Sequence, residues 1–480
     1  MSAPARHAHA PLGPIADGIL VNDVHSRLNA TRVARSVAVE TPEHAADVVR
    51  AARKAGLPVC PGGGRHAMGG QQFVTGGVLL DTRPMRRVLR LDAARGLVEA
   101  EAGVQWPELL AWLREAQRGA PVPWAIAQKQ TGADRLSLGG AVAANVHGRG
   151  LTMRPFVDDV EALTVVDANG NAVRCSRDER PELFRHVIGG YGMFGVVTTV
   201  TLRLVPRRQL RRAVEVRLVD DLMSAFDERI AAGHLYGDFQ FAVDHASDDF
   251  LRRGVLSSYA PVAEPRPVPA DQRALGADDW RRLLALAHVD KARAFREYAA
   301  HYLATDGQRY WSDEHQLGFY LDDYHEELDR MTGAPVAGSE MITELYVPRE
   351  RLADFMACAA DTLRALRANV VYGTVRLIER DEETALPWAR DRWACVVLNL
   401  HVDHTPAGID AAAAQFRALI DLAAVRDGSY YLTYHRWATR DQLLACHPAF
   451  PAWMAAKRRR DPDGVFQSDW WRWMEAVMRQ

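Results

Sequence analysis

The sequence predicts an α+β protein with an N-terminal domain interrupted by glycines and a larger second α+β domain. Short β-like runs alternate with brief helical runs from about residue 29 to residue 206, and most of their junctions are glycines. Residues 207 to about 429 carry longer helical patterns among several strands. With 48% hydrophobic and 25% charged residues among 480, the chain has ample material for a buried core.

The N-terminal elements follow from local signals. Thr41-Pro42 supplies an N-cap and a first-turn proline, which predicts a helix through Lys54. Asn169-Gly170 predicts the turn of a hairpin over 160–176. The apolar spacing over 108–117 predicts a second helix. Strands are expected at 36–39, 57–60, 78–81, 88–91, 97–101 and 195–205.

The rest of the chain has a different texture. Helices are expected over 352–366 and 411–424, and strands over 370–379 and 394–403. The proline-rich stretch 260–272 is typical of a surface loop. A further strand is expected over 429–438, followed by helical material to the end of the chain.

Composition narrows the function classes. A formal net charge of −2 provides no field that would hold the chain on nucleic acid or on an anionic membrane. The five cysteines are scattered, without a C-x-x-C pair, and indicate free thiols in a reducing compartment. The N-terminus shows no secretory signal, and the longest uncharged stretch, 186–202, is too short and glycine-rich for a transmembrane segment. We therefore expect a cytoplasmic protein that does not bind nucleic acid.

Glycine clusters are the strongest chemical signal. The cluster 61–70 directly follows an apolar strand, and its glycines would let several backbone N–H groups converge on one anion such as a pyrophosphate. In the cluster 131–149, Gly139-Gly140 would open a short helix whose N-terminal amides face a phosphate, with room for a planar ring.

A third cluster, 190–195, matches the spacing G-x-G-x-x-G of a dinucleotide fingerprint. That motif needs a strand before it and a helix after it. Here a helical pattern precedes the glycines and a strand follows them, so the sequence argues against a Rossmann site at this position.

The order and separation of the three clusters resemble the vanillyl-alcohol-oxidase superfamily, whose FAD-binding domain is of the p-cresol methylhydroxylase (PCMH) type. Residues 136–150, 160–174 and 182–202 are most similar in motif to bacterial decaprenylphosphoryl-ribose oxidase, and 63–68 is similar to the corresponding loop of alditol oxidase. The resemblance implies a two-lobed PCMH-type FAD-binding domain plus an α+β substrate (cap) domain. It divides the chain into 1–206 for FAD, 207–429 for substrate, and 430–480 returning to the FAD domain.

The resemblance also implies which residues bind FAD. The first loop would wrap the pyrophosphate and flavin, the second cluster would complete the phosphate, ribityl and ring contacts, and a valine backbone would meet the adenine. The implied residues are Gly62, Gly63, Gly64, Arg65, His66, Gly69, Gly70, Gly132, Ser137, Leu138, Gly139, Gly140, Asn145, His147, Gly148, Val197 and Tyr431.

His66 carries a further implication of the resemblance. The matching histidine of alditol oxidase is bonded to the flavin C8-methyl group, whereas the ribose oxidase has serine there and holds FAD noncovalently. The hypothesis is that His66 attaches FAD covalently, which would be expected to raise the reduction potential of the flavin. The alternative is a polar residue in a turn.

Candidate catalytic residues are those expected over the flavin: Glu344, Arg376, His401, Tyr434 and His147. Glu344 stands where the ribose oxidase has glutamine, and Tyr434 replaces a lysine of both relatives, so Arg376 or His435 would supply the missing cation. His147 would hydrogen-bond the substrate or assist proton removal, or else be a structural histidine. No metal is predicted, because strand alternation places His401 and His404 on opposite faces.

The predicted function is oxidation of a CH–OH group of a polyol, sugar or sugar-like alcohol by hydride transfer to FAD. The reduced flavin would pass its electrons to oxygen or another acceptor. Two alternatives stay open: an FAD-dependent reductase of an activated C=C bond that draws hydride from NAD(P)H, and a flavin-binding subunit without turnover.

Overall fold

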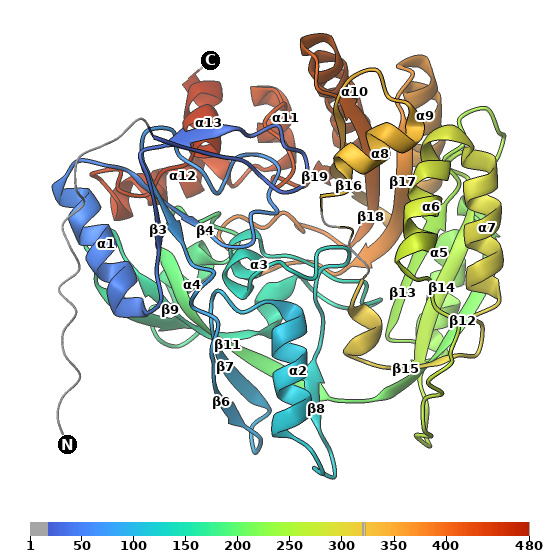
Figure 1. Ribbon diagram of the computed structural model, residues 1–480, viewed down its shortest axis with the longest axis horizontal. Coiled ribbons are helices and arrows are strands. Elements are labelled where there is room, and N and C mark those ends of the chain that lie inside the picture. Colours follow the sequence, from blue (N-terminus) through green and yellow to red (C-terminus); the bar gives the residue numbers. More distant parts are fainter. Residues whose placement is uncertain (1–17, 319–320, 322, 480) are drawn as a thin grey trace.

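The computed structural model describes residues 18–318, 321 and 323–479, and the described chain is built on four β-sheets (Figure 1). The smallest is the antiparallel pair β1 (Ile19–Val21) and β2 (Thr31–Val33). A parallel sheet has the order β3 (Arg35–Ala38), β5 (Val78–Asp81) and β4 (Val59–Gly62). The helix α1 (Pro42–Lys54) connects two of its strands, and its N-cap Thr41 accepts a hydrogen bond from the His44 backbone.

An antiparallel sheet forms the second layer of the N-terminal half. Its order is β10 (Ala172–Ser176), β9 (Val160–Val166), β11 (Val196–Pro206), β7 (Leu97–Glu101) and β6 (Val88–Asp92), and β8 (Trp124–Ile126) pairs with the end of β11. The helices in this part are α2 (Trp106–Ala116), α3 (Leu138–Ala144) and α4 (Pro181–Val187). α1 contacts both this sheet and β5, so it joins the two layers.

The largest sheet is antiparallel and lies on the right of Figure 1. Its order is β15 (Arg309–Trp311), β12 (Gln209–Leu218), β14 (Arg253–Pro261), β13 (Tyr236–Phe241), β17 (Val370–Ile378), β18 (Trp393–Asp403), β16 (Gly338–Pro348) and β19 (Ser429–Tyr430). Its helices are α5 (Leu222–Ala231), α6 (Ala277–Val289), α7 (Lys291–Leu303), α8 (His325–Thr332), α9 (Leu352–Ala365) and α10 (Pro406–Ala424). Short 3₁₀ turns occur at Phe156–Asp159, Val219–Asp221, Glu314–Gln316 and Arg349–Arg351.

The C-terminal helices return to the N-terminal half (Figure 1). They are α11 (Arg440–Cys446), α12 (Phe450–Arg460) and α13 (Asp469–Arg479). The Trp470 ring lies 4.9 Å from the Tyr191 ring, and the Trp453 ring lies 5.4 Å from the Phe194 ring. These aromatic contacts support the third glycine cluster from behind. None of the helices in the described residues has the length and apolar character needed to cross a membrane.

Most locally encoded elements were predicted correctly, and one strand was wrong. Of the strand expected over 429–438, only Ser429–Tyr430 pairs with β16. The chain then turns, and its carbonyls bond the first glycine cluster: Met68 and Gly69 N–H donate to the Thr433 carbonyl, and Gln71 Nε2 donates to the Leu432 carbonyl. The helix expected from residue 411 begins earlier, at Pro406, with Thr405 as its N-cap.

Candidate functional site

A single cavity brings the three glycine clusters together with residues of the largest sheet. Its open volume is about 1400 Å³ including the solvent at its mouth. The predicted site residues on its wall are Gly62, Gly63, Gly64, Arg65, His66, Gly132, Gly139, Gly140, His147, Val197, Glu344, Arg376, Tyr431 and Tyr434. The predicted residues Gly69, Gly70, Ser137, Leu138, Asn145, Gly148 and His401 do not line it.

The first loop offers backbone donors to the cavity. The N–H groups of Gly63, Gly64 and Arg65 donate to no other group of the described residues. Arg65 has a positive φ of 61°, a conformation that is costly for a residue with a side chain and is typical of functional loops. A Cβ on Gly63 would lie 2.1 Å from Ser137 Oγ, and one on Gly64 would lie 2.5 Å from the Arg135 carbonyl. The loop therefore keeps open an anion-binding nest that fits a pyrophosphate.

The second cluster corrects part of the sequence interpretation. Its glycines do open the helix α3, but the Leu138 and Gly139 amides donate to the Val104 and Ala102 carbonyls, and Gly140 N–H donates to the N-cap Ser137 Oγ. Those amides are therefore engaged within the protein and do not face a phosphate. What Gly139 and Gly140 present to the cavity is bare backbone, which a planar ring can approach closely.

The residues of this cluster that lie off the wall support it from behind. Ser137 and Leu138 are fully buried. Asn145 ends α3 at φ 46°, accepts a hydrogen bond from the Val157 N–H, and donates Nδ2 to Asp381. Gly148 N–H donates to Gln128. Their positions favour a structural contribution to the cavity.

The third cluster, residues 190–195, has a helix before it and a strand after it, which is the reverse of the order in a Rossmann site. Helix α4 precedes it and strand β11 follows it. Tyr191, Gly192 and Gly195 have φ values of 50°, 76° and 138°, so the segment turns sharply. Gly192, Gly195 and Val197 lie on the cavity wall.

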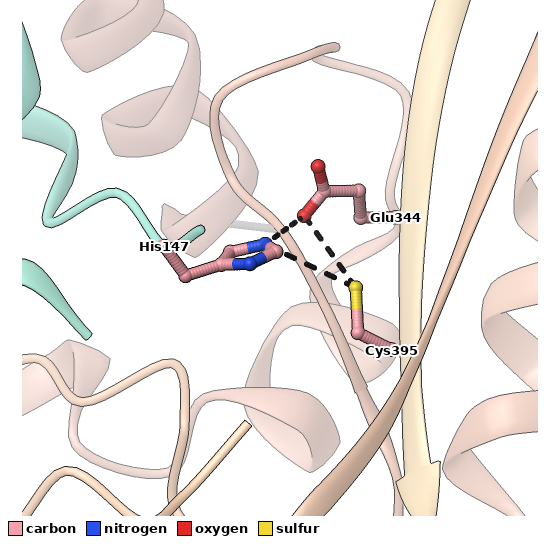
Figure 2. Close-up of side chains that lie close together, drawn as sticks. All are labelled: His147, Glu344 and Cys395. Carbon is pink, nitrogen blue, oxygen red and sulfur yellow. Dashed lines mark hydrogen bonds and ion pairs between the residues drawn. The ribbon is translucent and has the colours of Figure 1, made fainter. Parts of the chain in front are cut away.

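Glu344 is the centre of the polar wall. Its Oε2 atom accepts hydrogen bonds at 2.9 Å from His147 Nε2 and at 2.9 Å from the Tyr346 hydroxyl. Its Oε1 atom accepts a hydrogen bond at 2.9 Å from the Tyr434 hydroxyl. Figure 2 shows His147 and Glu344 facing each other from opposite sides of the site, with the Cys395 sulfur 3.9 Å from both. The side chain of Glu344 is only 5% exposed, and such a carboxylate needs these donors to stay in the interior.

The proton between His147 and Glu344 follows from the geometry. His147 Nδ1 lies 3.0 Å from the Gly148 carbonyl, which can only accept, so Nδ1 carries a hydrogen. Nε2 faces a carboxylate oxygen and needs a second hydrogen for an attractive contact. Burial raises the pKa of Glu344, but His147, the Arg376 charge and the Tyr346 hydroxyl outweigh it and hold that pKa below its ordinary value. Glu344 is therefore a carboxylate that accepts a hydrogen bond from His147.

The two tyrosines bonded to Glu344 remain donors. Burial, followed by the nearby Glu344 charge, raises the pKa of Tyr346 and of Tyr434 well above the ordinary phenol value. Both hydroxyls are therefore protonated at neutral pH, and of the two only Tyr434 lines the cavity.

Arg376 brings a buried positive charge to the same wall. Its residue is 7% exposed, and among the described residues no carboxylate lies within ion-pair distance of its guanidinium. Burial lowers the pKa of Arg376, yet neighbouring Tyr372, Cys395 and Glu344 raise it overall, so the charge persists. A buried guanidinium of this kind is suited to an electron-rich group of a bound molecule.

His66 also lies on the cavity wall, in the first loop. Its Nδ1 is 2.8 Å from Nε2 of the buried His25. Two ring nitrogens at this distance share one hydrogen, so His25 fixes the orientation of the His66 ring. Sequence reasoning missed His25, because nothing in the segment 18–30 signals a contact with a loop forty residues later.

His401 is far from this site. It pairs in register with Glu340, which precedes Glu344 by four residues on β16, and this corresponds to about 13 Å along a strand. Placing it over the flavin was therefore wrong in position. Tyr346 and Cys395 were missed, although Tyr346 shares the face of Glu344 by strand alternation and this pattern could have identified it.

Comparisons with known proteins give the class. The profile of a family described as an FAD binding domain matches residues 33–176. An L-gulono-1,4-lactone dehydrogenase of Mycobacterium tuberculosis is 25% identical over 435 residues, covering 89% of this chain and 92% of the relative. Cytokinin dehydrogenase 6 of Oryza sativa subsp. japonica is 31% identical over 347 residues, covering 66% and 62%. Cytokinin dehydrogenase 2 of Arabidopsis thaliana is 31% identical over 240 residues, covering 48% and 44%.

The cavity and these matches together define a flavin-dependent oxidoreductase. The chain belongs to the vanillyl-alcohol-oxidase superfamily of FAD-linked oxidases and dehydrogenases, with a PCMH-type FAD-binding domain. Its cofactor is FAD.

Proposed function

We propose that this flavoprotein oxidises a CH–OH group of a polyol, sugar or sugar-like alcohol. The observation that carries the proposal is the buried Glu344 carboxylate, which accepts hydrogen bonds from His147, Tyr346 and Tyr434 at the wall of the FAD cavity. A neutral alcohol must lose both a hydride and a proton when it becomes a carbonyl compound. This network provides a place for the proton.

FAD, when bound, accepts the hydride from the carbinol carbon. The protein handles the proton. The Tyr434 oxygen takes the substrate hydroxyl proton while Tyr434 passes its own hydrogen to Glu344 Oε1, and the carboxylate becomes neutral. The carbinol carbon thus loses one hydride, the oxygen loses one proton, and the C=O double bond forms.

His147 and Arg376 tune this transfer. Both side chains hold the Glu344 pKa down, which keeps the carboxylate ionised before substrate arrives. Arg376 also faces the cavity, and no carboxylate of the described residues pairs with it, so it stabilises negative charge on the substrate oxygen as the proton leaves.

For the cofactor, the amides of Gly63, Gly64 and Arg65, which donate to no group in the described part of the chain, would hold the pyrophosphate. Gly139 and Gly140 would contact the planar ring, and Val197 would lie at the adenine end. We further propose that residues 1–206 and 430–480 form the FAD domain, and that 207–429 form the substrate domain. The electron acceptor would be oxygen or another carrier.

Covalent attachment through His66 is part of this proposal. The contact with His25 holds the His66 ring on the cavity wall. Acid precipitation of the holoenzyme should leave yellow colour in the pellet, and the same treatment of His66→Ala should release it. Colour lost from both proteins would show that FAD is held noncovalently.

The substrate class can be tested by anaerobic reduction of the bound flavin. The holoenzyme would be mixed with alditols, aldoses, aldonolactones, a cytokinin and NADPH in turn, and the absorbance at about 450 nm followed. Reduction by a sugar-like alcohol is expected, and it should slow in Tyr434→Phe. Tyr430→Phe is the control, because Tyr430 is a buried tyrosine of the same segment that lies off the cavity wall. Rapid reduction by NADPH with none by any alcohol would favour the reductase alternative instead.

A further inference from the structure

A second cluster of ionisable side chains lies outside the FAD cavity. It contains His288 near the end of α6, Glu340 on β16 and His401 on β18. Their side chains are 8%, 2% and 14% exposed. Three separate elements therefore bring two imidazoles and one carboxylate to one buried point.

Glu340 is the centre of this cluster. Its Oε1 atom lies 3.0 Å from His401 Nδ1 and 3.3 Å from His288 Nε2. All three ligand atoms lie within 4.8 Å of one another. A tetrahedral zinc ion with bonds of about 2.0–2.1 Å to nitrogen and oxygen separates its ligand atoms by about 3.3–3.4 Å. The two distances from Oε1 therefore already approximate the edges of such a tetrahedron.

The His288 nitrogen points to a missing partner. His288 Nε2 is buried and has no hydrogen bond within the described part of the chain, although Glu340 Oε1 is 3.3 Å away. The two atoms are close but out of line, so the nitrogen is directed toward a third point beside the oxygen. A buried polar nitrogen without a partner is uncommon in folded proteins and indicates an absent ion or water.

Outer contacts fix the other two groups as ligands. His401 Nδ1 hydrogen-bonds Glu340 Oε1, and on metal binding Asp403 Oδ1, 3.4 Å from His401 Nε2, would hold the one remaining ring hydrogen on that nitrogen. The Tyr324 hydroxyl donates to Glu340 Oε2 at 2.5 Å. Gly338 makes room for the imidazole, because a Cβ there would lie 2.3 Å from His401 Cε1.

We propose that His288, Glu340 and His401 form a zinc-type divalent metal site in the second half of the chain. His288 Nε2, His401 Nδ1 and a Glu340 carboxylate oxygen are the ligands, and water completes the tetrahedron. The site ties α6 to the strands β16 and β18. It lies outside the FAD cavity, so its test does not depend on the function proposed above.

This site escaped the sequence analysis for a specific reason. From the sequence, His404 is the histidine considered as the neighbour of His401, but His404 Nε2 contacts Ser339 Oγ at 2.9 Å. The ligands that join His401 come from Glu340 across the sheet and from His288 more than a hundred residues earlier. No spacing rule connects residues 288, 340 and 401.

The test is metal content. The full-length holoenzyme, without a histidine tag, would be equilibrated with Zn²⁺, desalted and measured by inductively coupled plasma mass spectrometry. We expect about one Zn²⁺ per chain, which is the stoichiometry of a single closed site. His288→Ala and Glu340→Gln should lose it, whereas the neighbouring His404→Ala should retain it. Asp403→Asn should weaken Zn²⁺ binding by about 10- to 100-fold, as expected for an outer-shell partner.

Two further measurements separate the alternatives. Co²⁺ in place of Zn²⁺ should give the visible absorption of a tetrahedral ion in the native protein, and not in His288→Ala. If the alanine variants fail to fold, Asp403→Asn with its weaker binding carries the test. A chain that retains no Zn²⁺ after desalting would overturn the site and leave a hydrogen-bonded ion pair. Binding that survives His288→Ala but is lost in Cys395→Ala would place the metal at His147, Glu344 and Cys395 instead.

Discussion

Replacing Glu344 by glutamine tests the proton network directly. The amide keeps the size of the side chain but removes the charge, and it puts an NH₂ group where one carboxylate oxygen accepted hydrogen bonds. Tyr434→Phe removes only the hydroxyl that lines the cavity and donates to Oε1. The two variants therefore distinguish Glu344, the proposed proton acceptor, from Tyr434, the proposed relay.

The expected magnitudes follow from the hydrogen bonds. A bond to a charged acceptor contributes about 1.5–3 kcal/mol, so Tyr434→Phe should slow flavin reduction by about 10- to 150-fold. General base catalysis contributes about 10²- to 10⁴-fold, and Glu344→Gln should lose this whole factor. Because Tyr434 acts through Glu344, adding Tyr434→Phe to Glu344→Gln should cost little more.

The assay is stopped-flow reduction of the flavin at about 450 nm by the substrate found in the panel. Glu101→Gln is the matched control, because Glu101 is also buried but pairs with Arg87 away from the cavity. Independent, multiplicative losses in the double variant would refute the relay through Tyr434. A Glu344→Gln enzyme as fast as the native one would refute the carboxylate as proton acceptor.

Three other predictions address binding and stability. Gly63→Ala should lose bound flavin, because the added Cβ would lie 2.1 Å from Ser137 Oγ. Gly276→Ala is the control and should keep its flavin, because a Cβ there would lie 3.7 Å from its nearest neighbour. The ratio of visible to 280 nm absorbance measures the bound flavin. Arg376→Met should lower the rate of flavin reduction at saturating substrate by about 10- to 100-fold, since the charge acts as the oxygen becomes negative; an effect on KM alone would contradict this. Burial lowers the pKa of His435 and of His447 to about 3. Between pH 6.5 and pH 3 the unfolded chain therefore binds protons at these histidines that the folded protein does not bind. Stability should therefore fall as pH drops below about 6.5, by about 2 kcal/mol per histidine at pH 5, and continue falling toward pH 3; urea unfolding should show it, and His447→Leu should remove about half of the loss.

Local signals explain which parts of the fold the sequence predicted. Thr41-Pro42 places the start of α1, and Asn169-Gly170 places the turn between β9 and β10, because caps and tight turns depend on neighbouring residues. The strand order of the largest sheet was not predictable in this way, since β13 pairs with β17 more than a hundred residues later. The same limit explains the error over 431–434, where the Leu432 and Thr433 carbonyls bond the distant first glycine loop and the adjoining Gln71 in place of a neighbouring strand.

The candidate site shows the same difference between features with a local sequence signal and features that depend on long-range contacts. Its glycine loops could be found from the sequence, because a backbone that surrounds an anion or ring needs residues without side chains. The catalytic set could be found only in part. Glu344, Arg376 and Tyr434 came from the resemblance, while the bonds that join Glu344 to His147 and Tyr346 depend on tertiary contacts. His25, which orients His66, has no local signal at all.

Strand β16 connects the two sites physically. Glu340 and Glu344 are an even number of residues apart, so both carboxylates project from the same face of one strand. A buried carboxylate is costly unless donors or cations surround it, and each of these has its own set: histidines and Tyr324 around Glu340, and His147 with two tyrosines around Glu344. β18 pairs with β16 along its whole length, and β19 pairs with it at Leu345 and Tyr346, so a shift of the strand at one carboxylate also moves the other. A metal bound at Glu340 would therefore hold rigid the strand that presents Glu344 to the substrate.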